Sequence, residues 1–348
     1  MPKMIFMGVV AAMIIFTRLM KPPRTIKSWI AYVLAPLLLL VLAISVYNQV
    51  RSQPNLAEAW LYISQSFFSS SIWWLFAALI GMLFNWGLEA LKWQRLLSHT
   101  EPVSFTRAFR GVLTGVSFTL FTPNRIGEYL GRIWHLSADS RGAAVCLSIT
   151  GGIAQLFITA LFGMGAFEFL WKGGFTLSFL PDYPLSIFFL RFIGWSTTIV
   201  LLVLYFNLGA AGNFLSRLRW LRSIQNWMQA LTKFSLKELS LVLALSFFRY
   251  LVFLGQYFFL FQFFGVELPI SLSFSTVAFL FLALAMIPGV ALAELGVRGQ
   301  LSLWIVGAFS TNSLGIVFTA TTIWFINLIL PALAGGVLMM KNASGIKE

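Results

Sequence analysis

A small set of ionisable side chains lies within or beside long apolar segments of this chain, where a charge is costly and rarely faces lipid. They are Arg125, Glu128, Arg132, Arg249, Glu294 and Arg298. The arginines outnumber the carboxylates, so a self-neutralised network does not account for all of them. Arginine stays charged and forms two-pronged hydrogen bonds with phosphate oxygens. We therefore predict that Arg125, Arg132, Arg249 and Arg298 bind an anionic lipid headgroup.

Each carboxylate of this set stands four residues before an arginine, as Glu128 before Arg132 and Glu294 before Arg298. Residues at this spacing share one face of a helix. We expect both carboxylates, with Asn124, to support the arginines through ion pairs or to exchange protons. An alternative stays open, in which these residues only brace the local structure and each carboxylate ties down an arginine.

Residues that break helices accompany both pairs, and we assign this role to Pro123, Gly127, Pro288 and Gly289. A helix that restarts after such a break aims its free backbone amides at an anion. Non-helical backbone at membrane depth is tolerated only where protein or a water-filled cavity satisfies it. We therefore predict that two broken segments fold back within the bilayer and share a polar cavity.

The composition is that of an integral membrane protein. The 348 residues are 59% hydrophobic and only 10% charged, whereas soluble domains are roughly 25% charged. The net charge of +13 gathers in loops between apolar segments, which is typical of the positive-inside rule and not of nucleic-acid binding. The lone Cys146 and the separated His99 and His135 predict no disulfide framework, metal site or catalytic triad. We expect no cofactor and no enzymatic activity.

The apolar pattern predicts one all-α, multi-pass membrane domain with about six to eight transmembrane helices. Its parts are an N-terminal helix and basic linker (1–28), a first half (29–206) with a hairpin (105–136), a cytoplasmic amphipathic linker (207–238) and a second half (239–340) with a hairpin (268–311). The basic loops place the C-terminus in the cytoplasm and the chain in the cell membrane. Hairpins entered from opposite faces would make the halves inverted repeats, a recurrent transporter design.

Glu89 lies in the last turn of the predicted span 72–91, within one turn of Lys92 and Trp93. Charged residues at the end of a span commonly pair at the membrane surface. We therefore interpret Glu89 as part of an interfacial ion pair with no further role.

Two motifs resemble those of the lysylphosphatidylglycerol synthase transmembrane (flippase-like) family. The first is Pro123–Glu128 with Arg132, preceded by Trp93-x-x-Leu96-Leu97, and Asn124 stands where the family usually has glycine. The second is Ile287-Pro288 followed by Glu294–Arg298, in which the glutamate precedes Gly-Val-Arg instead of following it. The resemblance extends over the membrane domain, from about Trp29 to Met340.

This resemblance implies lipid handling. The best-known relatives carry a soluble domain that transfers lysine to phosphatidylglycerol, and we expect neither that domain nor aminoacyl transfer here. The predicted function is a flippase that moves a phospholipid or polyprenyl-phosphate-linked lipid with an anionic headgroup between leaflets. Two alternatives remain: an enzyme or accessory factor in lipid-linked glycan or phospholipid modification, with Glu128 as general base, and a non-transporting assembly factor. Anionic lipids are the expected partners, and a homo-oligomer is left open.

Overall fold

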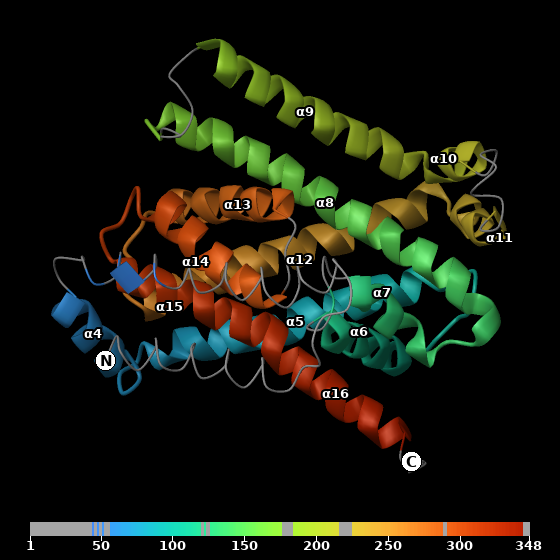
Figure 1. Cartoon of the computed structure of the whole chain (residues 1–348), viewed down its shortest axis with the longest axis horizontal. Helices are drawn as coiled ribbons and strands as arrows, with labels where there is room; N and C mark the ends of the chain where they lie inside the picture. Colours follow the sequence, from blue (N-terminus) through green and yellow to red (C-terminus); the bar gives the residue numbers. More distant parts are fainter. Residues whose placement is uncertain are drawn as a thin grey trace, which may run out of the picture.

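The computed structural model describes residues 56–119, 122, 126–175, 184–215, 225–287 and 291–343, and positions 44, 47, 48 and 51. All regular structure in these residues is helical, which confirms the predicted all-α class (Figure 1). The predicted N-terminal helix (1–28) and nearly all of the span that begins at Trp29 lie outside the described residues. The same is true of Pro123, Asn124, Arg125, Pro288 and Gly289.

Five helices of the described residues are long and apolar enough to cross a bilayer, so the chain is a multi-pass membrane protein. Four of them are α5 (Ile72–Leu96), α8 (Arg141–Lys172), α9 (Pro184–Phe206) and α12 (Leu236–Phe263). The fifth joins α15 (Ser313–Trp324), a π-helix η7 (Phe325–Ile329) and α16 (Leu330–Ala343). A short helix, α4 (Leu56–Ser66), precedes α5.

Each half contains a pair of short helices at the position of a predicted hairpin. The first pair is α6 (Phe105–Thr119, 15 residues) and α7 (Ile126–Arg132, 7 residues). The second is α13 (Ile270–Met286, 17 residues) and α14 (Ala291–Val306, 16 residues). A helix needs about 20 residues to cross the hydrocarbon core. These helices are shorter, as a hairpin that turns back within the bilayer requires.

Gly127 does not break a helix, contrary to its predicted role, because it lies inside α7. It is instead a point of close approach between α7 and α6. A Cβ atom at Gly127 would overlap the carbonyl oxygen of Phe118, and one at Gly131 would lie 2.6 Å from the carbonyl oxygen of Thr114. Glycine at both positions lets the two helices pack backbone to backbone.

The two halves pack on each other reciprocally. The spans α5 and α12 lie along one another, α6 of the first hairpin packs on α16, and α13 of the second hairpin packs on α8. Exchanging the two halves turns the α6–α16 contact into the α13–α8 contact, as a two-fold relation between the halves requires. The predicted inverted repeat would produce this pattern.

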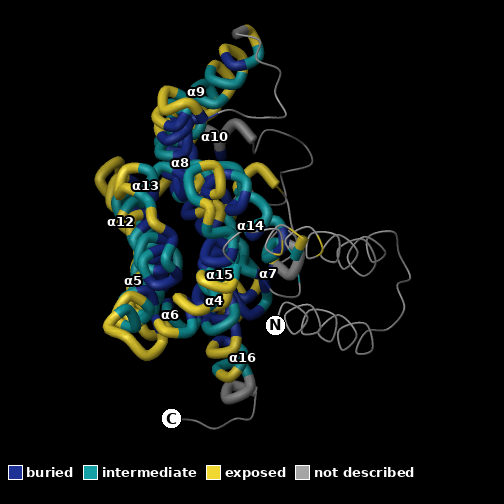
Figure 2. Tube along the Cα trace, turned by 90° about the vertical axis from the view of Figure 1, so that its left-hand side faces the viewer, coloured by how far each residue is buried: buried dark blue, intermediate teal, exposed yellow. Residues whose placement is uncertain are grey.

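Span α9, the last helix of the first half, lies at the periphery. Span α9 packs on α8 and α10 (Figure 1), and much of its surface is exposed (Figure 2). Exposed apolar side chains on α9 include Leu185, Phe188, Phe192, Ile199 and Val203. They suit contact with lipid tails. The described part of the predicted amphipathic linker forms α10 (Leu208–Leu215), α11 (Gln225–Met228) and a 3₁₀ helix η6 (Gln229–Lys233), not one continuous helix.

A hydrogen-bonded carboxylate ties together the two ends of the first hairpin. Glu101, in the connection from α5 to α6, accepts hydrogen bonds from the backbone nitrogen (3.0 Å) and hydroxyl (2.7 Å) of Ser137, which follows α7. It also pairs with Arg107 of α6 at 2.8 Å. Burial raises the pKa of Glu101, but the Ser137 hydrogen bonds and the Arg107 charge outweigh this effect and hold the pKa below its ordinary value.

We expect Glu101→Gln to lower the free energy of unfolding by about 1–2 kcal/mol at neutral pH, because hydrogen bonds to a charged group are lost. A carboxylate with a lowered pKa contributes stability above the ordinary glutamate pKa, about 4.3, and loses it as the pH falls. Thermal unfolding in detergent should therefore show a difference in unfolding temperature between the wild type and Glu101→Gln, and this difference should close below that pH. A difference in unfolding temperature that persists unchanged at acidic pH would contradict this role of the carboxylate.

Candidate functional site

Glu89 of α5 is the centre of a buried cluster of charges. Its carboxylate lies 2.7 Å from Nζ of Lys92, 2.7 Å from Nη2 of Arg132 on α7 and 3.0 Å from Nη1 of Arg249 on α12. The residue is only 2% exposed. The predicted pair with Lys92 therefore forms, but the interfacial interpretation was wrong. The pair lies inside the helix bundle and joins three elements of both halves.

Lys92 has no contact with solvent that would stabilise its charge, since it is 1% exposed. Its ammonium group faces Glu89 and donates to the carbonyl oxygen of Gly151 on α8 at 3.4 Å. Removing one member of a buried ion pair leaves an uncompensated charge. The carboxylate of Glu89 is shared by three cations from α5, α7 and α12, of which Arg132 also pairs with Glu128.

Arg132 is held between two carboxylates, those of Glu89 and Glu128, and is 5% exposed. Its guanidinium also lies over the ring of Trp93, 5.7 Å from the ring centroid. The i, i+4 pair with Glu128 that the sequence predicts therefore exists. The second contact of Arg132, with Glu89, holds α7 against α5.

Arg249 enters the site from α12 and is held by neutral as well as charged groups. Its Nε donates to Oδ1 of Asn85 at 2.7 Å, and its Nη1 reaches Oε1 of Gln155 at 3.5 Å. The guanidinium lies 5.3 Å from the ring centroid of Trp86 and 5.4 Å from that of Phe253. Such contacts orient a guanidinium without removing its charge.

A chain of amides connects Arg249 to the last span. Nδ2 of Asn85 donates to Oδ1 of Asn327 at 2.8 Å, and Nδ2 of Asn327 donates to the carbonyl oxygen of Ile323 at 3.2 Å. Because arginine only donates, Asn85 must present its oxygen to Arg249 and its nitrogen to Asn327. Asn327 lies in the π-helix η7, and π-helical turns are frequent at functional sites.

We expect Asn85→Leu to lower the free energy of unfolding by about 2–3 kcal/mol, since buried polar groups of Asn327 and Arg249 would lose their partner. Asn327→Leu should cost about as much, and the double variant less than the sum, because both break one chain. Thermal unfolding of the purified single and double variants in detergent measures this coupling. Strictly additive losses would show that the two amides act independently.

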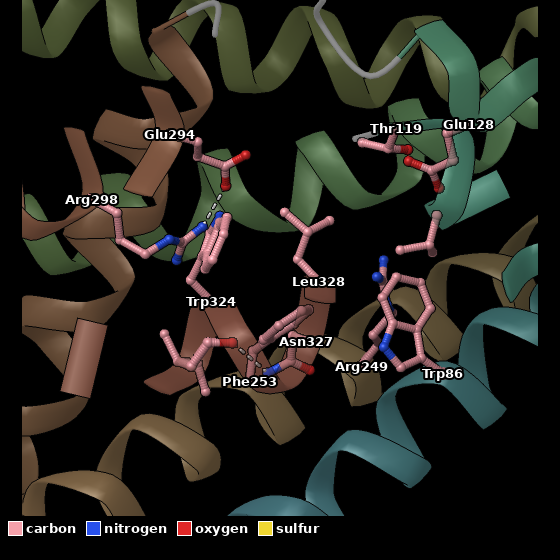
Figure 3. Close-up of a pocket in the computed structure, with 12 residues that line it drawn as sticks. Trp86, Thr119, Glu128, Arg249, Phe253, Glu294, Arg298, Trp324, Asn327 and Leu328 are labelled. Carbon is pink, nitrogen blue, oxygen red and sulfur yellow. Dashed lines mark hydrogen bonds and ion pairs between the residues drawn. The ribbon is translucent and has the colours of Figure 1, made fainter. Parts of the chain in front are cut away.

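A cavity of about 60 Å³ lies between the two halves, with room for a few water molecules. Figure 3 shows Glu294 and Arg298 on one side, Glu128 and Arg249 on the other, and Trp324 and Leu328 between them. The complete lining is Trp86, Val116, Thr119, Glu128, Arg249, Phe253, Glu294, Arg298, Ile323, Trp324, Asn327 and Leu328. Both hairpins and both central spans therefore contribute to the wall.

Arg298 is one of two residues of α14, with Glu294, that line the cavity. Its Nη2 pairs with Oε1 of Glu294 at 2.7 Å, and its Nη1 donates to the hydroxyl of Tyr257 on α12 at 3.0 Å. Its side chain is 13% exposed, against 6% for Arg132. The guanidinium is thus positioned by two groups and still borders the cavity.

The structure therefore brings Glu128, Arg249, Glu294 and Arg298 to one cavity, and it places Arg132 behind the cavity wall. The predicted roles of Arg125 and Asn124 fall on residues outside the described part of the chain. Among the described residues, histidines, cysteines and acidic residues form no group of three or more that could hold a metal ion.

Sequence reasoning missed several neutral or paired residues of the site: Asn85, Glu89, Lys92, Tyr257 and Asn327. Glu89 and Lys92 carried a signal, because a carboxylate and an ammonium group stand three residues apart at the end of an apolar segment, but only the structure shows that α5 continues past them to Leu96. The two asparagines and Tyr257 carried none, since isolated neutral side chains in spans are common.

The family model "Lysylphosphatidylglycerol synthase TM region" matches residues 62–335. The chain belongs to this family. The match runs from α4 into α16, so the lysylphosphatidylglycerol synthase TM region here contains both hairpins, the Glu89 cluster and the whole cavity lining. Membership of the family supports a membrane protein with a lipid-related function. Neither a curated protein nor a solved structure matches the chain.

Proposed function

We propose that this protein moves a lipid with an anionic headgroup between the leaflets of the cell membrane. The observation that carries the proposal is the cavity between the halves, to which Arg249 and Arg298 each contribute a guanidinium from a different element. Two guanidinium groups facing one cavity suit a phosphate, because each can offer two parallel N–H donors. The family match supports the lipid nature of the ligand.

The carboxylates hold the arginines while no headgroup is bound. Glu294 pairs with Arg298, and Glu89 pairs with Arg249. An entering phosphate competes with these carboxylates for the guanidinium donors. A displaced carboxylate takes up a proton, so that each arginine keeps one anionic partner and no uncompensated carboxylate remains in the membrane. The acyl chains stay in the bilayer, where their transfer needs no polar path.

The cavity must widen during transport, since its present volume holds only a few waters. The reciprocal packing of the halves provides the surfaces that would move, namely α6 against α16 and α13 against α8. Rocking of one repeat against the other around a fixed central site is a common basis of alternating access. The Glu89 cluster would act as the pivot, since it joins α5, α7 and α12.

Vesicles containing the full chain and a trace of headgroup-labelled phosphatidylglycerol test this function. A membrane-impermeant reductant bleaches only the probe in the outer leaflet, so translocation exposes the inner pool. We expect the protein to expose the inner pool of the anionic probe faster than that of a labelled phosphatidylcholine. Arg191→Ala is the matched control, because Arg191 pairs with Glu168 at 3.0 Å between α9 and α8, away from the cavity lining. A wild-type rate equal to that of protein-free vesicles would refute the proposal.

A further inference from the structure

The two hairpins contain corresponding arginine sites. In each, a glutamate and an arginine four residues apart lie on the second helix, as Glu128 and Arg132 on α7 and Glu294 and Arg298 on α14. Each arginine also reaches back to the span that precedes its hairpin. Arg132 contacts a residue of α5 that lies 43 positions earlier, and Arg298 contacts one of α12 that lies 41 positions earlier.

The residues that the two arginines contact on the preceding spans differ in charge. The partner on α5 is Glu89, and the partner on α12 is Tyr257. Arg132 therefore lies between two carboxylates, whereas Arg298 lies between one carboxylate and a neutral phenol. The two arginines also differ in position, since Arg298 lines the cavity and Arg132 does not.

The charge difference decides which arginine can accept an oxyanion. Arg132 lies directly between Glu128 and Glu89, although Glu89 is shared with Lys92 and Arg249. A phosphate brought beside these two carboxylates would meet like-charge repulsion in a poorly screened site. Among the described residues, Arg298 forms an ion pair with one carboxylate, that of Glu294, and the phenol of Tyr257 can keep its hydrogen bond while the oxyanion binds. Arg249 lines the same cavity and adds a second positive group.

We propose that Tyr257 determines which half of the protein binds the headgroup: its neutral phenol, in the place that Glu89 occupies in the first half, leaves the charge of Arg298 available to the phosphate oxyanion of a lipid. Arg132 is then a brace and Arg298 the ligand-binding member of the pair. This inference rests on the proposed function, and it assigns the anion specificity of the transport to one residue, Tyr257.

Tyr257→Glu gives the second half the two-carboxylate arrangement of the first. We expect it to slow translocation of headgroup-labelled phosphatidylglycerol at least about tenfold, since a compensated Arg298 loses its attraction for the phosphate. Tyr257→Phe removes one neutral hydrogen bond and adds no charge, so it should slow translocation only about threefold. Tyr250→Phe is the matched control, because this buried α12 tyrosine does not line the cavity. Equal rates for the Glu and Phe variants would overturn the proposal.

A measurement on the wild-type protein does not depend on how well Tyr257→Glu folds. Phenylglyoxal modifies accessible guanidinium groups, and peptide mass spectrometry locates the product. In vesicles of phosphatidylcholine alone, Arg298 should be modified and Arg132 should not. Adding phosphatidylglycerol should protect Arg298 and leave Arg132 unmodified. Equal modification of the two arginines, or an Arg298 that phosphatidylglycerol does not protect, would overturn the assignment.

The two experiments separate this inference from the proposed function. If the wild-type protein moves no lipid but Arg298 is protected selectively, the translocase proposal fails and the assignment of the anion site holds. If lipid moves but Tyr257→Glu has the wild-type rate, the translocase proposal holds and the role of Tyr257 is wrong.

Discussion

Glu89→Gln is expected to lower the free energy of unfolding by about 3–5 kcal/mol, the range found when one member of a buried ion pair is removed. The variant would leave Lys92, Arg132 and Arg249 without the carboxylate that lies within 3.0 Å of each. Glutamine keeps the size of the side chain, so the loss reports charge and not a cavity. Thermal unfolding in detergent, followed by tryptophan fluorescence, measures it.

Glu168→Gln is the matched control for this substitution. Glu168 also pairs with an arginine, Arg191 at 3.0 Å, but it is 27% exposed, and no other described residue forms an ion pair with either of them. Partly exposed pairs are worth roughly 0–1 kcal/mol. A Glu89 variant as stable as the Glu168 variant would mean that the buried cluster does not hold α5, α7 and α12 together.

Arg298→Ala is expected to slow translocation of the anionic probe about a hundredfold, because truncating a desolvated charge that binds an opposite charge costs on the order of 2–5 kcal/mol. Arg298→Lys should recover part of the rate, since it keeps the charge but loses the two-pronged geometry. The vesicle assay with labelled phosphatidylglycerol gives both rates.

The interpretation of Arg298→Ala depends on an intact fold. Arg298 lies at the cavity wall, and its partner Glu294 is 18% exposed, so the carboxylate left by Arg298→Ala is less deeply buried than the charges left by Glu89→Gln. The unfolding temperature of Arg298→Ala should therefore be closer to that of the wild type than the unfolding temperature of Glu89→Gln. Arg191→Ala serves as the transport control. An Arg298→Ala rate equal to that of Arg191→Ala would remove Arg298 from the translocation path.

The described spans and the two pairs of short helices could be predicted from the sequence, because the length of an apolar segment is a local property. The order of α5, α6–α7, α8 and α12, α13–α14, α15–α16 follows the predicted halves. The sequence misplaces a boundary where charge lies inside a helix. Glu89 and Lys92 suggested an end near residue 91, but α5 continues to Leu96 because the two charges pair within the bundle.

The candidate site could be predicted only in part. The cost of a charge in an apolar segment correctly drew attention to Glu128, Arg249, Glu294 and Arg298, which line one cavity. Spacing predicts that Glu128 and Arg132 share a helical face but not which neighbour that face meets. The contact of Arg132 with Glu89, 43 residues away, removes it from the cavity, and only the tertiary structure shows that contact.

An experimental density map of the protein in nanodiscs that contain phosphatidylglycerol tests the central claim most directly. The account predicts a headgroup density in the cavity, with phosphate oxygens about 3 Å from the guanidinium nitrogens of both Arg249 and Arg298. In nanodiscs of phosphatidylcholine alone, that density should be weaker. A cavity without headgroup density, in a map that resolves lipids on the outer surface of α9, would contradict the account.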